Sequence, residues 1–317
     1  MRLFILNAVA CAGLAWAQSS AVSTTTSVDV NGHRVQEGPQ VTRTTSPGQT
    51  VTTEMSQSIN GRLVPTERVE ERVLRDDASG RVVERVIRRY DSQGNPTAPE
   101  RQTIEEQKRS DGSSTVQTTT YRGDINGGLQ IAQRSVTETR KNGSQETSQT
   151  VIQRPTLNGG MDTVEKQSST TVKDSAGGYQ TDSVTYRRGV GGDFYAAKRE
   201  SIEHSQKGTQ STDRTAEYEV GSSGQLELHS QTVSNTVDQS DGSKSIVVDM
   251  FSKNAPGTVS DSPQMKLQEQ QVINRKRGAN DSVIETICVR RPTVSDPNAL
   301  GPARQLSETV CRGNCKP

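Results

Sequence analysis

The sequence has few residues that could build a hydrophobic core. Aromatic residues make up 3% of its 317 residues, and all hydrophobic residues together make up 29%. A chain of this length usually forms one or two domains that bury enough apolar surface to offset the conformational entropy lost on folding. This composition supplies little such surface. It therefore argues against a large enzyme with a deep, dry pocket.

Long apolar runs and an excess of charge of one sign are also lacking. Beyond the N-terminus no stretch approaches the 18 apolar residues of a membrane-spanning helix, so no transmembrane segment is expected in the mature chain. Loss of residues 1–17 removes one of the 38 basic residues and none of the 37 acidic ones, which leaves 37 of each sign. A chain without net charge lacks the basic field that binds phosphates, so no nucleic-acid partner is expected.

The N-terminal segment has the form of a secretion signal. Arg2 precedes an apolar run over residues 3–14, and a small-residue cleavage site ends at Ala17. We therefore expect residues 1–17 to be a signal peptide that is cleaved after Ala17. The mature protein is then exported to the periplasm, the cell surface or the extracellular space. The alternative is lipidation of Cys11, because the residues before it loosely resemble a lipobox.

Glycine-containing turns recur along the chain at a regular spacing. One series of turns repeats about every 33 residues, and a second series lies between its members. The glycines of the first series are Gly32, Gly61, Gly94, Gly127, Gly159, Gly192, Gly224 and Gly257. Those of the second series are Gly48, Gly80, Gly112, Gly143, Gly177, Gly208, Gly242 and Gly278. Two turns per period, over about eight periods, constitute an internal repeat.

Larger side chains accompany the turns of the first series. Before these turns stand Tyr90, Tyr121, Tyr186 and Tyr218. After them a single larger apolar residue often follows, as at Leu63, Leu129, Met161, Phe194 and Leu226. These positions keep the phase of the glycines, which indicates that the repeat is genuine although its sequence has diverged.

The turn chemistry and the segments between turns identify the repeat unit as a β-hairpin. Asn-Gly, Asp-Gly and Gly-Gly favour tight hairpins because both central residues need positive φ. The intervening segments are rich in Thr, Val and Ser, as in residues 113–121, and β-branched residues favour strands. Residues 69–90 place apolar side chains at helical spacing, but Gly80 and Gly94 keep the repeat phase there. We therefore predict strands in this region as well.

The expected fold is all-β, a long antiparallel β-meander built from about eight 33-residue hairpin repeats. It would contain about sixteen strands of roughly 12 residues. Residues 18–291 are expected to form this repeat region, and residues 292–317 a C-terminal tail that contains Pro and Cys. Because apolar positions are sparse and change face along a strand, we expect an extended or curled sheet with much of both faces in water. Unpaired edge strands template pairing, so self-association through the sheet edges is one hypothesis for its binding.

One turn resembles the repeat unit of a known family. Residues 90–95 read Tyr-Asp-Ser-Gln-Gly-Asn, which is similar to the Tyr-Asp-x-x-Gly-Arg/Asn unit of the RHS/YD (tyrosine–aspartate) repeat proteins. Residues 121–129 are a looser echo of the same unit. In that family such units are β-hairpins joined into a large curved sheet that can form a shell. The resemblance implies a curved hairpin sheet and carries over no activity.

No arrangement of residues indicates catalysis, a cofactor or a metal site. The histidines His33, His204 and His229 lie in different repeats without the spacing of metal ligands. Asp and Asn before glycine, as in residues 29–32 and 124–127, are explained by hairpin turns rather than by calcium loops. Ser and Asp are so abundant that no hydrolytic triad can be placed. We therefore expect a protein that is not an enzyme.

Three cysteines lie near the C-terminus, at Cys288, Cys311 and Cys315. Exported chains meet oxidising conditions, so a disulfide is expected. Folding residues 283–289 back onto residues 305–311 favours a Cys288–Cys311 pair, which leaves Cys315 as an odd thiol. A Cys311–Cys315 pair is the alternative.

These observations predict an exported, non-enzymatic β-repeat protein that acts as a scaffold or as a surface-interaction or adhesion module. Its partner would be a protein, a cell-surface polymer or other copies of itself. The alternative is a largely disordered, Ser/Thr/Gln-rich exported spacer, which the low apolar content permits. The regular hairpin turns favour the first hypothesis.

Overall fold

The protein is built from β-strands alone over the part of the chain that can be described. The computed structural model describes residues 19–29, 33–35, 38–46, 50–123, 128–253, 264–280, 282–293, 299–313 and 315. Among these residues all strand pairings are antiparallel, and none of the elements is a helix. The same residues therefore contain no helix long and apolar enough to cross a membrane.

Nineteen strands follow one another along the chain. They are β1 (Ser19–Val28), β2 (Arg34–Val35), β3 (Gln40–Ser46), β4 (Thr50–Ile59), β5 (Arg62–Asp77), β6 (Gly80–Arg89), β7 (Glu100–Lys108), β8 (Ser114–Gly123), β9 (Leu129–Asn142), β10 (Gln145–Pro155), β11 (Met161–Lys173), β12 (Tyr179–Arg188), β13 (Phe194–Lys207), β14 (Gln210–Val220), β15 (Leu226–Asp238), β16 (Lys244–Ser252), β17 (Lys266–Arg277), β18 (Val283–Arg290) and β19 (Arg304–Gly313). The predicted all-β meander is confirmed, including the strands β5 and β6 in the region with helical spacing.

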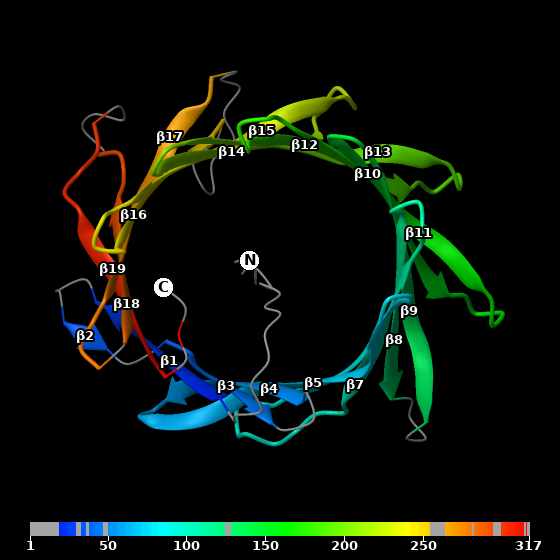
Figure 1. Ribbon diagram of the computed structural model, residues 1–317, viewed down its shortest axis with the longest axis horizontal. Coiled ribbons are helices and arrows are strands. Elements are labelled where there is room, and N and C mark those ends of the chain that lie inside the picture. Colours follow the sequence, from blue (N-terminus) through cyan, green and yellow to red (C-terminus); the bar gives the residue numbers. More distant parts are fainter. Residues whose placement is uncertain are drawn as a thin grey trace.

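The sheet closes on itself. From β3 to β19 each strand pairs with the next, and β1 pairs with both β19 and β3, so that Ser23 lies opposite Cys311 on one side and Val41 on the other. The two-residue strand β2 pairs only with the end of β1. Figure 1 shows the resulting ring viewed along its axis. The expectation of an extended or curled sheet is corrected to a closed barrel, because closure pairs the backbone groups that two edge strands would leave unpaired.

Closure also overturns the hypothesis of self-association through sheet edges. Each long strand that the structure describes has a neighbour on both sides, so the barrel offers no free edge to another chain. The last strand, β19, lies within residues 292–317, which were expected to form a tail, and it completes the ring. The expected signal peptide, its cleavage site after Ala17 and Cys11 lie outside the described residues.

The barrel is wide and is not filled by a packed core. Strands about 4.8 Å apart and tilted by about 40° place opposite walls of such a ring roughly 35 Å apart. The buried hydrophobic residues of the described chain are Val64, Ile87 and Val283, and no large side chain is fully buried. Cohesion therefore comes mainly from the backbone ladders and from cross-strand side-chain pairs.

The strand pairings divide the side chains consistently into two faces around the whole ring. Strand β13 shows the difference between them, because Lys198, Glu200 and Ile202 are half-buried whereas Arg199 and Glu203 are exposed. On the concave side of a closed sheet the side chains converge, and on the convex side they diverge. The more sheltered set therefore lines the inside of the barrel. We call this set the inner face and the other set the outer face.

A ring of β-bulges runs around one end of the barrel. Seven strand pairings shift register at the same level, six of them near a turn of the first series and the seventh near the β18–β19 connection. The residues before the shifts are Met55, Thr120, Ile152, Thr185, Glu217, Met250 and Ile287. Bulges bend the strand that carries them and are common at the rims of barrels. Figure 1 shows the consequence, since hairpin ends project outward from the ring all around it.

Candidate functional site

The hairpin ends beyond the seven bulges form the most distinctive surface of the molecule, which we call the crown. It consists of the described residues within 56–66, 121–132, 153–164, 186–197, 218–229, 251–268 and 288–306. The described turns of the first series, at Gly61, Gly94, Gly159, Gly192 and Gly224, lie at this rim because the strands alternate in direction. Each hairpin end is held by its own short ladder and turn, as where the Gly159 amide donates to the Thr156 carbonyl at 3.1 Å.

The crown carries most of the exposed apolar side chains. Ten large hydrophobic residues are exposed in the described chain, and seven of them belong to the crown: Leu63, Leu129, Leu157, Val190, Tyr195, Val220 and Leu306. Two of these stand at turn tips with almost no protein around them, since Leu157 is 106% exposed and Val190 is 111% exposed. Exposed apolar side chains of the described chain are thus concentrated at this rim.

Aromatic side chains lie on the outer face at the base of the crown. Tyr121, Tyr186 and Tyr218 each follow a bulge directly and lie opposite an apolar residue of the next strand. Cations cover two of the aromatic rings here, because the Arg199 guanidinium lies 5.3 Å from the centre of the Tyr218 ring and the Lys166 ammonium lies 4.4 Å from that of Phe194. Such contacts stabilise the bend, and they leave these two rings less free to bind a ligand by stacking.

The residues that accompany the first-series turns were the sequence signal for this surface. Leu63, Leu129, Met161, Phe194 and Leu226 all lie in the crown. Their recurrence showed a repeat, but the exposure of Leu63 and Leu129 could not be read from the sequence. A large apolar residue that returns once per hairpin ordinarily packs into a core, and here the sheet has no second layer to cover it.

The charges around the hairpin ends of β10–β11 and β12–β13 are paired with each other. Arg187 donates to Glu165 at 3.5 Å, and Arg188 forms an ion pair with Asp162. Both pairs join β11 to β12, which are neighbouring strands of adjacent hairpins. This part of the crown therefore combines exposed apolar tips with ion pairs that cancel most of its charge.

The inner face is lined by polar side chains that bond to one another across strands. Hydroxyl pairs span neighbouring strands at Thr137–Thr150 and Thr171–Thr181, both with oxygens 2.8 Å apart. Glu100 has a side chain only 10% exposed, and it accepts hydrogen bonds from Arg122 at 2.9 Å. The wall thus satisfies its own polar groups instead of directing them at one point.

Glu217 forms an ion pair in this wall that connects three strands. Its two carboxylate oxygens accept hydrogen bonds from Lys198 at 2.8 Å and from Ser230 at 2.9 Å. The bond from Lys198 is the main cause that lowers the pKa of Glu217 below its ordinary value, and the same bond raises the pKa of Lys198. Both groups are therefore charged at neutral pH, and the pair joins β13 to β14 and β15.

The three histidines lie in different hairpins, and each contacts a carboxylate. His204 contacts Asp213 through Nδ1 at 2.6 Å and stacks on Tyr179 with ring centres 5.0 Å apart. His33 lies 3.3 Å from Asp29, and His229 lies 3.8 Å from Glu219. Each histidine thus has a carboxylate partner from its own neighbourhood. In the described part of the chain no group of three or more His, Cys, Asp or Glu residues could hold a metal ion.

The cysteine pairing differs from the one that the sequence favoured. Cys311 and Cys315 form a disulfide, and Cys288 is a free, half-buried thiol. The antiparallel register places Val283 rather than Cys288 opposite Cys311, and Cys288 lies opposite Gln305. Because five positions separate Cys288 from Val283 along β18, the two cysteines lie on opposite faces of the sheet. The preferred Cys288–Cys311 pair is therefore wrong, and the alternative pair is correct.

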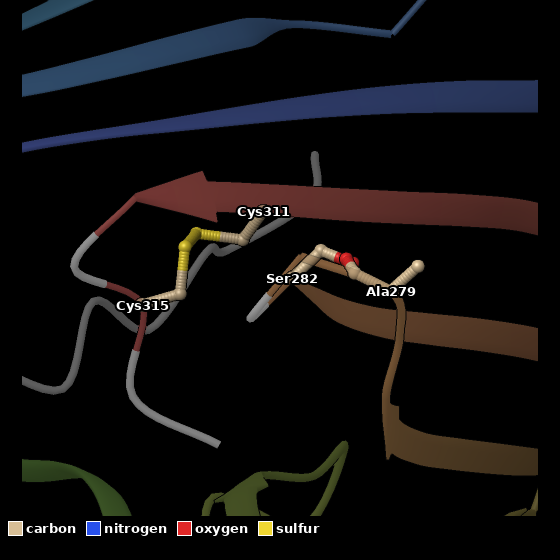
Figure 2. Close-up of a disulfide and its surroundings, with 4 residues drawn as sticks. All are labelled: Ala279, Ser282, Cys311 and Cys315. Carbon is tan, nitrogen blue, oxygen red and sulfur yellow. A yellow bond between two sulfur atoms is a disulfide. The ribbon is translucent and has the colours of Figure 1, made fainter.

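The disulfide returns the chain toward β19 just after that strand ends. Figure 2 shows Cys315 turned back to Cys311, with Ser282 and Ala279 of the β17–β18 turn nearby. The Ser282 hydroxyl donates to the Ala279 carbonyl at 2.8 Å, which closes this turn. The disulfide therefore lies at the end of β19, the strand that pairs with β1 to close the barrel.

Comparison with known proteins gave no match to a family model, a curated protein or a solved structure. The resemblance of residues 90–95 to the RHS/YD unit therefore stays a prediction from the motif. In the structure this motif is a tight turn, because the Asp91 carboxylate accepts hydrogen bonds from the amides of Gln93 at 2.9 Å and Asn95 at 2.8 Å.

Proposed function

We propose that the protein is an exported, non-enzymatic β-barrel that acts as a scaffold and presents its crown as a surface-interaction or adhesion module. The observation that carries this proposal is the concentration of exposed apolar residues in the crown, seven of the ten in the described chain. The inner wall adds support, because its polar groups bond to each other rather than converge on a reactive point.

Export is the first part of the proposal. The predicted signal sequence supports it, and so does the Cys311–Cys315 disulfide, because disulfides form and persist in oxidising compartments. The test is to produce the full chain in a bacterial host with an intact secretion pathway and to determine the N-terminus of the mature product. We expect it to begin at Gln18 and to be found outside the cytoplasm. A product that keeps residues 1–17 in the cytoplasm contradicts export.

Surface interaction is the second part, and paired variants test it. One variant carries Leu157→Ser and Val190→Ser in the crown. The control carries Val172→Ser and Val237→Ser, which are exposed apolar residues at the opposite rim. The measurement is the fraction of protein retained by the secreting cells after washing. We expect several-fold lower retention for the crown variant and unchanged retention for the control. Equal retention of both variants and the parent sinks this part of the proposal.

The spacer hypothesis finds no support in the structure. A largely disordered chain would form few fixed pairings, whereas the described residues form one continuous sheet of nineteen strands. Regular register over most of the chain favours a protein that holds its hairpin ends in fixed positions.

A further inference from the structure

We propose that two copies of the protein associate through their crowns, with the β10–β11 hairpin of each copy packed against the β12–β13 hairpin of the other. This inference rests on the proposed function, because it names a second copy as the partner of the crown. The crown takes the place of the sheet edges as the surface for self-association, because closure of the barrel leaves no free edge.

The two hairpins present matching apolar tips. Leu157 stands at the tip of β10–β11 and Val190 at the tip of β12–β13, and both are fully exposed. The hairpins are adjacent because β11 pairs with β12. We call these two hairpins and the hairpin on each side of them the arc. In the arc, Tyr195 is 50% exposed, and Leu129 and Val220 on the flanking hairpins are 50% and 40% exposed. Together they place five exposed apolar side chains on four neighbouring hairpin ends.

The charge of this arc allows two identical surfaces to meet. Like charges brought together would oppose association. The ion pairs Arg187–Glu165 and Arg188–Asp162 cancel within each copy. A neutral arc with apolar tips suits a second copy better than an anionic membrane surface, which would require unpaired basic residues.

Two further charges make the arc complementary to itself. Arg154 lies on β10 just beyond the bulge in the β10–β11 pairing, and Asp193 precedes β13. Neither side chain forms an ion pair within the described chain, and both are exposed. In a symmetric dimer, residue i of one copy contacts residue j of the other and the reverse. A two-fold axis between the hairpins sets Leu157 against Val190 and Arg154 against Asp193, twice each.

Sedimentation of the chain from residue 18 to residue 317 tests the association. We expect a concentration-dependent monomer–dimer equilibrium in the micromolar range. Leu157→Asp should raise the dissociation constant about a hundredfold, since it places a charge in the apolar contact. Val172→Asp at the opposite rim is the matched control and should leave the constant unchanged. A monomer at all concentrations up to about 1 mM, or a dimer indifferent to Leu157→Asp, overturns the proposal.

Charge reversal tests the orientation of the two copies. Arg154→Asp and Asp193→Arg should each raise the dissociation constant roughly tenfold, because each places like charges together across the interface. The double variant exchanges the two signs and should return to within about threefold of the parent. Additive losses in the double variant overturn the proposed pairing of hairpins.

The sedimentation and retention experiments together distinguish failure of the dimer from failure of the proposed function. If the chain stays monomeric yet its retention by cells still depends on Leu157 and Val190, the crown is an interaction surface for another partner, and only the dimer is wrong. Flotation of the monomer with phosphatidylcholine vesicles, lost in the Leu157→Asp variant, would identify that partner as a lipid surface. If neither retention nor association depends on these residues, both proposals fail.

Discussion

Glycines that share a positive φ meet very different surroundings in this barrel. Gly80 has a φ of 152° and lies where β6 runs beside β7, so a Cβ added there would overlap the backbone oxygen of Glu106. Gly143 has a φ of 58° at a second-series turn, and a Cβ there would meet nothing within 4 Å. The first glycine is required by packing as well as by conformation, and the second by conformation alone.

We therefore expect Gly80→Ala to destabilise the protein much more than Gly143→Ala. The alanine at position 143 should cost about 1 kcal/mol, the usual penalty of the left-handed region for a residue with a Cβ. The alanine at position 80 adds displacement of the β7 backbone and should cost at least about 2–3 kcal/mol. Chemical denaturation followed by circular dichroism measures both. Equal losses would show that β7 yields to the added methyl group at little cost.

Aspartates at the second-series turns make stability depend on acid pH. Asp111 and Asp241 each accept a hydrogen bond from the amide of the serine two residues later, at 2.9 and 2.8 Å, and Asp77 does the same with Ser79. Bonds to these serines are the main cause that lowers the pKa of all three carboxyl groups below 3.8. A lowered pKa in the folded state means that stability is present above pH 3.8 and is lost as the pH falls through the folded value.

The triple variant Asp77→Asn, Asp111→Asn, Asp241→Asn should therefore unfold at a lower temperature than the parent at pH 6. The difference should shrink as the pH falls below about 4 and the parent carboxylates become protonated. Thermal unfolding at a series of pH values measures this. Asp76→Asn is the control, because Asp76 forms only an exposed ion pair with Arg81 at 3.7 Å. A gap between parent and triple variant that does not shrink as the pH falls below about 4 contradicts the explanation.

At the scale of the element, the bulge decides which way a hairpin end points. In β13, Lys198 lies opposite Thr185 and Ala196 lies opposite Tyr186, so Ala197 is the extra residue. The residues beyond it face the opposite way from those of an unbroken strand, and the strand bends. The bulge thus brings Phe194 to the outer face, where Lys166 covers its ring.

Deletion of Ala197 should straighten this hairpin end and exchange the faces of Phe194 and Tyr195. We expect the rest of the barrel to fold, with a loss of about 1–3 kcal/mol, because only one hairpin end is affected. The crown contact should be lost, which sedimentation measures. Ala197→Gly keeps the extra residue and is the control, expected to retain the association of the parent. Unchanged association after the deletion would show that the bend does not position the surface.

The hairpin elements were predictable because each depends on local sequence. Turn glycines and β-branched segments fix where a strand starts and ends, and they prevailed in residues 69–90 over an apolar pattern of helical spacing. The bulges were not predictable, since a single extra residue leaves no composition signal and only shifts the pairing. The cysteine pairing failed for a related reason. It depends on the register of β18 against β19, and an antiparallel register puts Val283, not Cys288, opposite Cys311.

At the scale of the whole molecule, closure depends on the number of strands. An antiparallel ring requires an even number, and β1 with β3–β19 satisfies this requirement. Each period of the repeat contributes two strands. A change in the number of periods therefore changes the width of the barrel and keeps the number of strands even. The sequence predicted the repeat but not the closure, because closure depends on the curvature accumulated over all strands.

Excision of residues 145–179 should therefore give a smaller closed barrel. It removes β10 and β11 and joins Ser144 to Gln180. Gln180 can take the place of Gln145 because both residues lie opposite Val172, and they therefore share a face and a level of the barrel. We expect a folded all-β protein with a ring narrower by roughly 4 Å, measured by X-ray scattering. Removal of β10 alone leaves an odd number of strands, and this control should fail to fold. If the even excision also unfolds, closure depends on particular strands rather than on their parity.

The seam between β1 and β19 differs from every other pairing in one respect, the length of chain that it spans. Hairpins form between neighbours, whereas the hydrogen bond between Thr25 and Thr309 joins residues 284 positions apart. Contacts of such separation form late, because the intervening chain must first be ordered. The chain therefore passes through an open meander with two unpaired edges before the ring closes. During synthesis this open form is exposed to aggregation, and the speed of closure decides how long the exposure lasts.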